Sequence, residues 1–142
     1  NKKGLCKTDF DLWATMLRIN VLAPLKIIES FTPQVTSSDK KMIVSISSLL
    51  GSISANDSGG QYAYRSSKAA LNSVNKSLSV DLAGKGVISI VISPGWVRTD
   101  MGGPEATIGP VESVAGIRTV IDSLQPEDTG NFFNFDGSYI NW

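Results

Sequence analysis

The sequence predicts an α/β fold with a doubly wound parallel sheet, and the alternation of two kinds of segment carries that prediction. Two short runs of β-branched and other apolar residues, at 40–48 and 86–96, have the composition of strands buried on both faces of a sheet. A third short strand is expected at 131–137. Helical periodicity occupies the stretches between and around these strands: 8–31, 62–82 and 110–124. Strands that alternate with helices form right-handed βαβ units on a parallel sheet.

The first expected helix has a clear start and one apolar stripe. Thr8 is the expected N-cap, with Asp9 and Asp11 as acidic residues in the first turn. The helix is expected to run to about Phe31. Its stripe is formed by Trp13, Met16, Leu17, Ala23, Ile27 and Phe31.

The second and third helices are bounded by glycine and proline. Gly84 and Gly86 end the second helix, as C-cap glycines commonly do, and Pro110 suits the first turn of the third. The buried side of the second helix is expected to hold Leu71, Val74, Leu78 and Leu82. Residues 1–142 therefore make one domain of about three strands and three helices, with no internal repeat.

One feature of this domain indicates a missing part. The strand at 41–47 is apolar on both faces and expects a neighbour on each edge, yet nothing upstream is a strand. An exposed hydrophobic edge is one that soluble proteins avoid. We therefore expect the chain to be the C-terminal part of a larger doubly wound sheet.

The composition excludes several function classes. A net charge of zero gives no basic excess for nucleic acid and no charge run for a membrane surface, and no apolar stretch is long enough to span a bilayer. Cys6 is the single cysteine and histidine is absent, which excludes an intrachain disulfide, the usual zinc sites and Ser-His-Asp or Cys-His mechanisms. We expect no metal and a reduced, cytoplasmic location. Proton chemistry must use Tyr, Lys, Asp or Glu.

Tyr64 and Lys68 are the first candidates for that chemistry. Residues four apart share one face of a helix, so the ammonium of Lys68 can approach the phenol of Tyr64. A nearby cation favours the phenolate, which suits a tyrosine that protonates a carbonyl oxygen or deprotonates an alcohol. The alternative is a surface tyrosine beside a lysine whose stem covers apolar surface.

Asn20 lies in the middle of the first helix's apolar stripe, where a buried amide needs partners. Pro24, four residues later, has no N–H, so the backbone carbonyl of Asn20 loses its usual helical partner. The alternative is a proline kink with an incidental asparagine.

Polar and aromatic residues follow the two long strands, at the edge where open α/β sheets bind ligands. Ser45, Ser47 and Ser48 close the first strand and offer a hydroxyl for a carbonyl oxygen; the alternative is turn-forming serines. Pro94-Gly95 ends the second strand. Trp96 and Met101 beyond it form either core or the wall of an apolar pocket. The glycines at 58–60 and 101–103 lack the context of a phosphate loop.

Together these pieces resemble the short-chain dehydrogenase/reductase family from its active-site half onward. The family's motifs are matched by INV (19–21), SISS (45–48), YRSSK (64–68) and PGWVRT (94–99). The longer stretches SSLLGSI, GGQYAYRSSKAALN, SPGWVRTDMGG and FFNFDGSYINW are similar to the branch with C-factor and sniffer-type carbonyl reductases. The resemblance implies a Rossmann-like fold that lacks its N-terminal strands, about 90 residues of a doubly wound sheet.

The resemblance also implies a role for each matched residue. Tyr64 would donate the proton to the carbonyl, with hydride arriving from a nicotinamide. Lys68 would favour ionisation of Tyr64 and bind the nicotinamide ribose. Ser48 would orient the substrate oxygen, and the main-chain carbonyl of Asn20 would hold a water that links Lys68 to solvent.

The cofactor and substrate surfaces are implied in the same way. The nicotinamide side would be lined by Pro94, Gly95, Val97 and Thr99, besides Tyr64 and Lys68. Ser48, Trp96 and Met101 would contact a small carbonyl or alcohol substrate. The nearer relatives imply NADP, with NAD as the alternative.

The family's glycine-rich pyrophosphate loop and its Asn-Asn-Ala-Gly strand are missing from the sequence. The resemblance therefore leaves two functions open. One is a carbonyl reductase or alcohol dehydrogenase present as a part of the full enzyme. The other is a non-catalytic truncated member that acts as a dimerisation or signalling partner, through a homodimer that uses helices 8–32 and 62–83.

Overall fold

The structure is a computed structural model that describes residues 7–142. Its centre is a parallel sheet in the order β1-β2-β3, formed by Met42–Ile46, Ile88–Ser93 and Phe132–Asn134. The register pairs Val44 with Ile90 and Ile92 with Phe133. The parallel α/β class predicted from the alternation of segments is confirmed, with each strand shorter at its ends than expected.

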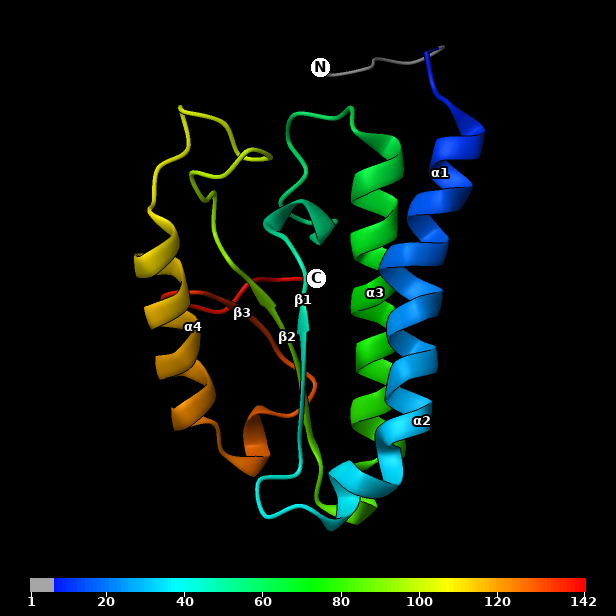
Figure 1. The fold of residues 1–142 in the computed structure, drawn as a ribbon, viewed down its shortest axis with the longest axis vertical. Helices are drawn as coiled ribbons and strands as arrows, with labels where there is room; N and C mark the ends of the chain where they lie inside the picture. The colour runs from blue at the N-terminus through cyan, green and yellow to red at the C-terminus, as the bar shows by residue number, and fades with distance from the viewer. Residues whose placement is uncertain (1–6) are drawn as a thin grey trace.

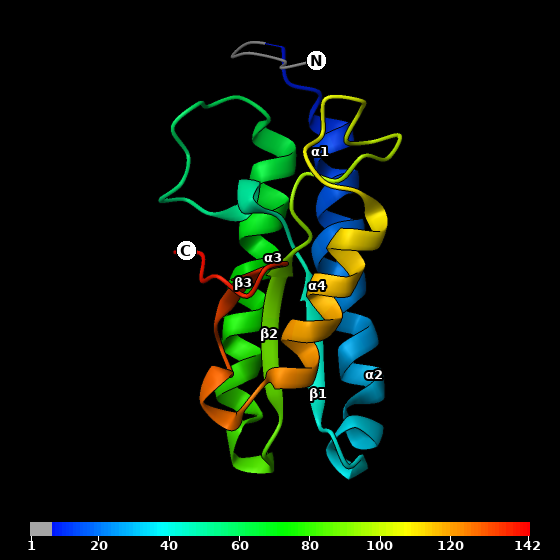
Figure 2. The same ribbon diagram turned by 90° about the vertical axis from the view of Figure 1, so that its left-hand side faces the viewer.

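Helices cover both faces of the sheet, as Figures 1 and 2 show. One face is covered by α3 (Tyr62–Asp81), with α1 (Phe10–Leu17) and α2 (Ala23–Ser37) beside it. The other face is covered by α4 (Pro110–Ser123). The short helical turns are η1 (Arg18–Leu22), η2 (Leu49–Gly51), η3 (Ala83–Lys85) and η4 (Pro126–Asp128).

The first helix differs from the prediction at its start, its middle and its end. Asp9 is the N-cap instead of Thr8, because the Asp9 carboxylate accepts a hydrogen bond from the backbone N–H of Leu12 at 3.0 Å. The helix then passes through a π-helical turn, η1, and continues to Ser37 instead of ending near Phe31. Pro33 lies inside the added part.

The π-helical turn breaks the predicted apolar stripe. A π turn inserts one extra residue, which rotates everything after it by about 100° around the helix axis. Ile27 and Phe31, predicted on the stripe, are consequently 59% and 57% exposed. Ile28 and Val35 point to the core instead, where they pack against buried side chains of the sheet and α3.

The core has one cluster on each face of the sheet. The cluster on the α4 face is larger and consists of Ile88, Ile90, Ile92, Val120, Leu124 and Phe133. The cluster on the other face is smaller and consists of Ile43, Leu82 and Val87. β2 supplies Ile88, Ile90 and Ile92 to the larger cluster, and Val87, directly before β2, points to the smaller one, as the alternation of a strand requires.

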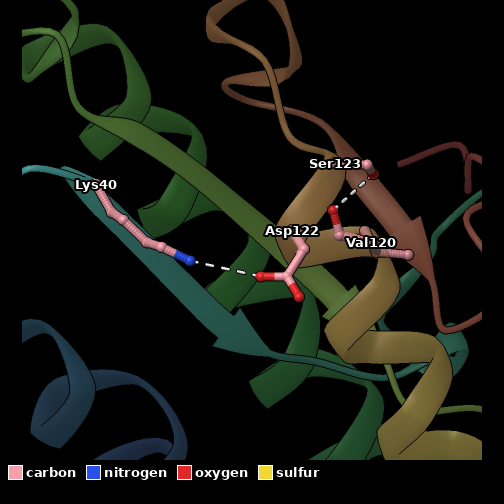
Figure 3. Close-up of polar contacts among 4 residues, drawn as sticks. All are labelled: Lys40, Val120, Asp122 and Ser123. Atoms are coloured by element: carbon pink, nitrogen blue, oxygen red, sulfur yellow. Dashed lines mark hydrogen bonds and ion pairs between the residues drawn. The ribbon is translucent and has the colours of Figure 1, made fainter.

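An ion pair on the surface links the segment before β1 to the end of α4. Lys40 Nζ lies 3.5 Å from Asp122 Oδ1, and Figure 3 shows the two side chains pointing toward each other. The side chains are 72% and 62% exposed, so this pair adds at most about 1 kcal/mol to stability. Within residues 7–142 no helix is long and apolar enough to cross a membrane.

Candidate functional site

Three of the predicted site residues, Ser48, Tyr64 and Lys68, lie where β1 ends beside α3. β1 runs toward Ser47 and Ser48, and the short turn η2 that follows lies beside the N-terminal half of α3 (Figure 1). Ser48 is the N-cap of η2, and its Oγ accepts a hydrogen bond from the backbone N–H of Leu50 at 3.2 Å. The end of β1, the turn η2 and the N-terminal half of α3 therefore lie together at Ser48.

Tyr64 and Lys68 lie on the same face of α3, as their spacing predicts. The Lys68 ammonium is 5.9 Å from the centre of the Tyr64 ring, and it donates a hydrogen bond to the carbonyl oxygen of Ile46 at 3.1 Å. Both side chains are half-buried. Burial lowers the pKa of Lys68 from its usual value of 10.5, because desolvation disfavours the charged amine.

Asn20 lies in the π-helical turn and contacts the helix that carries Tyr64. Its Nδ2 donates to Ser67 Oγ at 3.0 Å, and the Ser67 hydroxyl donates to the backbone carbonyl of Tyr64 at 2.8 Å. The backbone N–H of Ala23 reaches back to Arg18, the five-residue bond of a π turn. The turn follows from the sequence, because Pro24 cannot donate the usual bond to Asn20.

A groove of about 320 Å³ joins Asn20 to Lys68. Both residues line it, together with Pro24 and Ile46. Its remaining walls are mainly the outer edge of β1 and apolar side chains of the first helix: Ile19, Ile27, Ile28, Ile43, Val44, Ser45 and Leu71. The groove is thus apolar along its length, with Asn20 and Lys68 among its few polar residues.

The segment after β2 is fixed by close backbone packing. Gly95 has a φ of +78°, and a Cβ atom there would lie 2.6 Å from Ile108 Cδ1, so only glycine suits this turn. The Pro94 carbonyl accepts a hydrogen bond from Ser113 Oγ at 2.7 Å, which ties the turn to α4. Val97 pairs with Ile108, and Thr99 Oγ1 accepts from the backbone N–H of Gly102 at 3.2 Å.

Trp96 and Met101 are not core residues. Their exposed fractions are 53% and 87%. The indole N–H of Trp96 donates to the carbonyl oxygen of Gly102 at 2.8 Å, which folds the loop back on itself. The sequence left two interpretations of Trp96 and Met101 open. The structure excludes core packing, and their role as the wall of an apolar pocket stays a prediction.

Two residues that sequence reasoning missed hold the site together. Asn72, one turn after Lys68, accepts a hydrogen bond from the Ser47 hydroxyl at 2.5 Å and donates to the Gly51 carbonyl at 3.2 Å. Gly51 packs so tightly on α3 that a Cβ would lie 2.9 Å from Lys68 Cβ. The available signal was an asparagine next to Leu71 on the buried side of a helix, where an amide needs partners.

Comparisons with known proteins show the family of this chain. The family model described as short chain dehydrogenase matches residues 2–107. Among curated proteins, the chain is 42% identical over 139 residues to C-signal of Myxococcus xanthus, covering 98% of this chain and 84% of that protein. It is 39% identical to 1-hydroxy-2-glutathionyl-2-methyl-3-butene dehydrogenase of a Rhodococcus strain, covering 94% of this chain and 60% of that enzyme.

Solved structures give the same result. Carbonyl reductase Sniffer of D. melanogaster superposes with a TM-score of 0.95 at 33% identity, over all of this chain and 62% of that one. An NADPH-bound carbonyl reductase from chicken fatty liver superposes with a TM-score of 0.92 at 30% identity, with the same coverage. The chain thus spans most of C-signal and about 60% of the other relatives named here.

Proposed function

Because this chain belongs to the short-chain dehydrogenase family, we propose that it is the catalytic part of an NADP-dependent oxidoreductase that interconverts a small carbonyl compound and its alcohol. The observation that carries the proposal is the position of Lys68, which lies 5.9 Å from the centre of the Tyr64 ring and lines one groove with Asn20. NADP is proposed over NAD because the chicken carbonyl reductase is described as NADPH-bound.

Tyr64 is proposed as the group that gives a proton to the carbonyl oxygen, or takes one from the alcohol. When bound, the cofactor supplies the hydride. Lys68 is held near the Tyr64 ring, and its bond to the carbonyl oxygen of Ile46 fixes the position of the ammonium there. The lowered pKa of Lys68 supports a second role for this residue, as a proton donor, since a partly desolvated amine releases a proton more readily than a free lysine.

Ser48 and Asn20 are proposed as the other two catalytic residues, beside Tyr64 and Lys68. The Ser48 hydroxyl follows β1 at the ligand-binding edge of the sheet, which suits a hydrogen bond to the substrate oxygen. The π-helical turn at Asn20 supports a backbone carbonyl that is free to hold a water near Lys68, since Pro24 leaves that carbonyl without its helical partner.

The residues present fit the nicotinamide end of the cofactor. An ammonium has three donors, and the hydrogen bonds of Lys68 use one, on Ile46. Ribose hydroxyls suit the other two. The turn from Pro94 to Thr99, with Gly95 at positive φ, is proposed as the nicotinamide wall, and Trp96 with Met101 as the substrate wall.

The pyrophosphate end is proposed to come from strands outside this chain. No glycine-rich turn with the spacing of a dinucleotide site joins a strand to a helix in the sequence. The outer edge of β1 and the apolar groove beside it support a further parallel strand at this position. The coverage of about 60% of several relatives supports the same conclusion.

A second candidate function is a dimerisation or signalling partner without catalysis of its own. Large apolar side chains on the outer face of the first helix favour it. Phe10, Leu22 and Phe31 are between 57% and 73% exposed, and exposed apolar patches mark interaction sites. A homodimer through α1, α2 and α3 would cover them, and it is compatible with either function.

A fluorescence titration of NADPH tests the catalytic proposal. It compares the 142-residue chain alone with a chimera in which this chain replaces the matching part of D. melanogaster Sniffer. We expect no saturable binding by the chain alone, and both binding and carbonyl reduction by the chimera. A chimera that binds NADPH but turns over neither aldehydes nor alcohols would favour the non-catalytic partner.

A further inference from the structure

The proposed chemistry needs Ser48 at a fixed distance from Tyr64 and Lys68, although these residues come from two different elements. Ser48 stands on the turn after β1, whereas Tyr64 and Lys68 stand on α3. The position of a serine on a short turn depends on the contacts that hold the turn in place. A catalytic group displaced by about 1 Å can lower a rate by about 10²-fold.

Asn72 makes the contacts that hold this turn from the α3 side. Its side chain is 2% exposed and uses both halves of its amide. Oδ1 accepts from the hydroxyl of Ser47, and Nδ2 donates to the carbonyl of Gly51. The two bonds reach the residue directly before Ser48 and the residue that ends η2, so one side chain holds the turn on both sides of Ser48.

The turn packs closely against α3 around Asn72. A Cβ on Gly51 would lie 2.9 Å from Lys68 Cβ and 3.0 Å from Asn72 Nδ2. From the other side, Ser93 Oγ at the end of β2 accepts a hydrogen bond from the backbone N–H of Leu49 at 3.1 Å. The turn is therefore clamped between α3 and β2.

We propose that Asn72 is a positioning residue for the reaction, which fixes the Ser48 turn against the Tyr64–Lys68 pair through Ser47 and Gly51. The proposal rests on the proposed oxidoreductase function for its effect on catalysis, but the clamp itself is a property of this chain. Asparagine suits the position because the contact needs one acceptor and one donor on a short side chain. Aspartate keeps the acceptor and lacks the donor.

Amide hydrogen exchange on the 142-residue chain tests the clamp without any activity. The backbone N–H groups of Gly51 and Ser52 bond to Ser48 and Leu49 at 2.8 and 3.0 Å, so their exchange reports on the turn. We expect Asn72→Ala to accelerate exchange of these two amides by about tenfold relative to the amides of the sheet, as the loss of one or two hydrogen bonds implies. Asn72→Asp should give a smaller acceleration.

A control separates local loosening from general destabilisation. Leu82→Ala removes a buried side chain at the far end of α3, where it packs against Ile43 and Val87. It should lower global stability without a selective effect on Gly51 and Ser52. If Asn72→Ala and Leu82→Ala change exchange of these two amides equally, Asn72 is only a packing residue and the proposal is wrong.

Kinetics of the Sniffer chimera test the catalytic consequence. Asn72→Ala should lower kcat by about 10²-fold with the KM for NADPH unchanged, because the serine is displaced while the cofactor surface stays intact. An unchanged kcat in a folded Asn72→Ala chimera would overturn the proposal. If every chimera is inactive, the oxidoreductase proposal fails, while the exchange experiment still decides whether Asn72 holds the turn.

Discussion

The two faces of the central sheet are built by different kinds of contact. On the α4 face, β2 presents Ile88, Ile90 and Ile92 to apolar partners. On the α3 face, the same strand presents Val91 and two serines, Ser89 and Ser93, and each of the three is at most 1% exposed. The buried residues that α3 turns toward this face are also largely polar and include Asn72, Asn75 and Ser79.

This difference separates stability from geometry. Apolar packing is non-directional and tolerates small shifts, so the α4 face can supply much of the folding energy without fixing any distance. Hydrogen bonds fix distance and angle, and buried polar groups are costly when they lose a partner. The proposed reacting groups lie on the face with directional contacts. Substitutions on the two faces should therefore change different measurements.

The largest effect is expected from Tyr64→Phe on the α3 face. In the Sniffer chimera it should lower turnover by about 10²–10⁴-fold, because the proton donor is lost while the ring remains. Affinity for NADPH and the unfolding midpoint should change little. The matched control is Tyr62→Phe, which alters a more exposed tyrosine, 40% accessible, on the same helix. Equal losses in both variants would contradict the role of Tyr64.

The next effect is expected from Ile90→Ala on the α4 face. Ile90 is fully buried in the larger cluster, so removing its side chain should lower the free energy of unfolding by about 2–5 kcal/mol. Urea unfolding of the 142-residue chain measures this change. Val111→Ala, at a position 84% exposed on α4, should stay within about 0.5 kcal/mol of the unmodified chain. A similar loss from both would mean that the α4 face is not the main source of stability.

A smaller loss is expected from Asn75→Ala on the α3 face. Asn75 Nδ2 donates to Ser89 Oγ and to the carbonyl of Ile90, both at 3.1 Å. Truncation strands these acceptors and should lower the free energy of unfolding by about 1–3 kcal/mol. Adding Ser89→Ala should cost less in the Asn75→Ala background than in the unmodified chain, which a double-mutant cycle measures. Additive losses would show that the two side chains are not coupled.

The smallest effect is expected from Lys68→Met, and it appears only at alkaline pH. Burial lowers the pKa of Lys68 in the folded chain, whereas the unfolded chain keeps the usual value of 10.5. Between these two values the unfolded state binds more protons, so the free energy of unfolding rises with pH in that window. Lys68→Met should remove this rise, and Lys85→Met, at an exposed position, should keep it. Identical pH profiles for the two variants would contradict the desolvation of Lys68.

The sequence was sufficient for the fold because strands and helices each repeat one period over many residues. The prediction failed at residues 18–22, since a π turn shifts the helical period by one residue and the apolar pattern alone does not reveal the shift. Pro24 was the only local sign of it.

The relative positions of the candidate site residues were predictable only in part. Tyr64 and Lys68 share a helix face, so their spacing was enough. Asn72 was missed because its partners, Ser47 and Gly51, belong to a segment more than 20 residues away, and only the folded chain shows that they meet.

The parallel register of β1 and β2 also determines how this chain can fold. Met42 pairs with Ile88, and these residues are roughly 46 positions apart, so no hairpin can nucleate the sheet and a long loop must close first. The connecting α3 shortens that search, because a helix of 20 residues replaces a flexible segment. We therefore expect φ values near one half in α3 and near zero in β3, measured from rates of refolding. Asn72, in the middle of α3, would then be among the first side chains to find its partners, so the turn that carries Ser48 would be set early in folding.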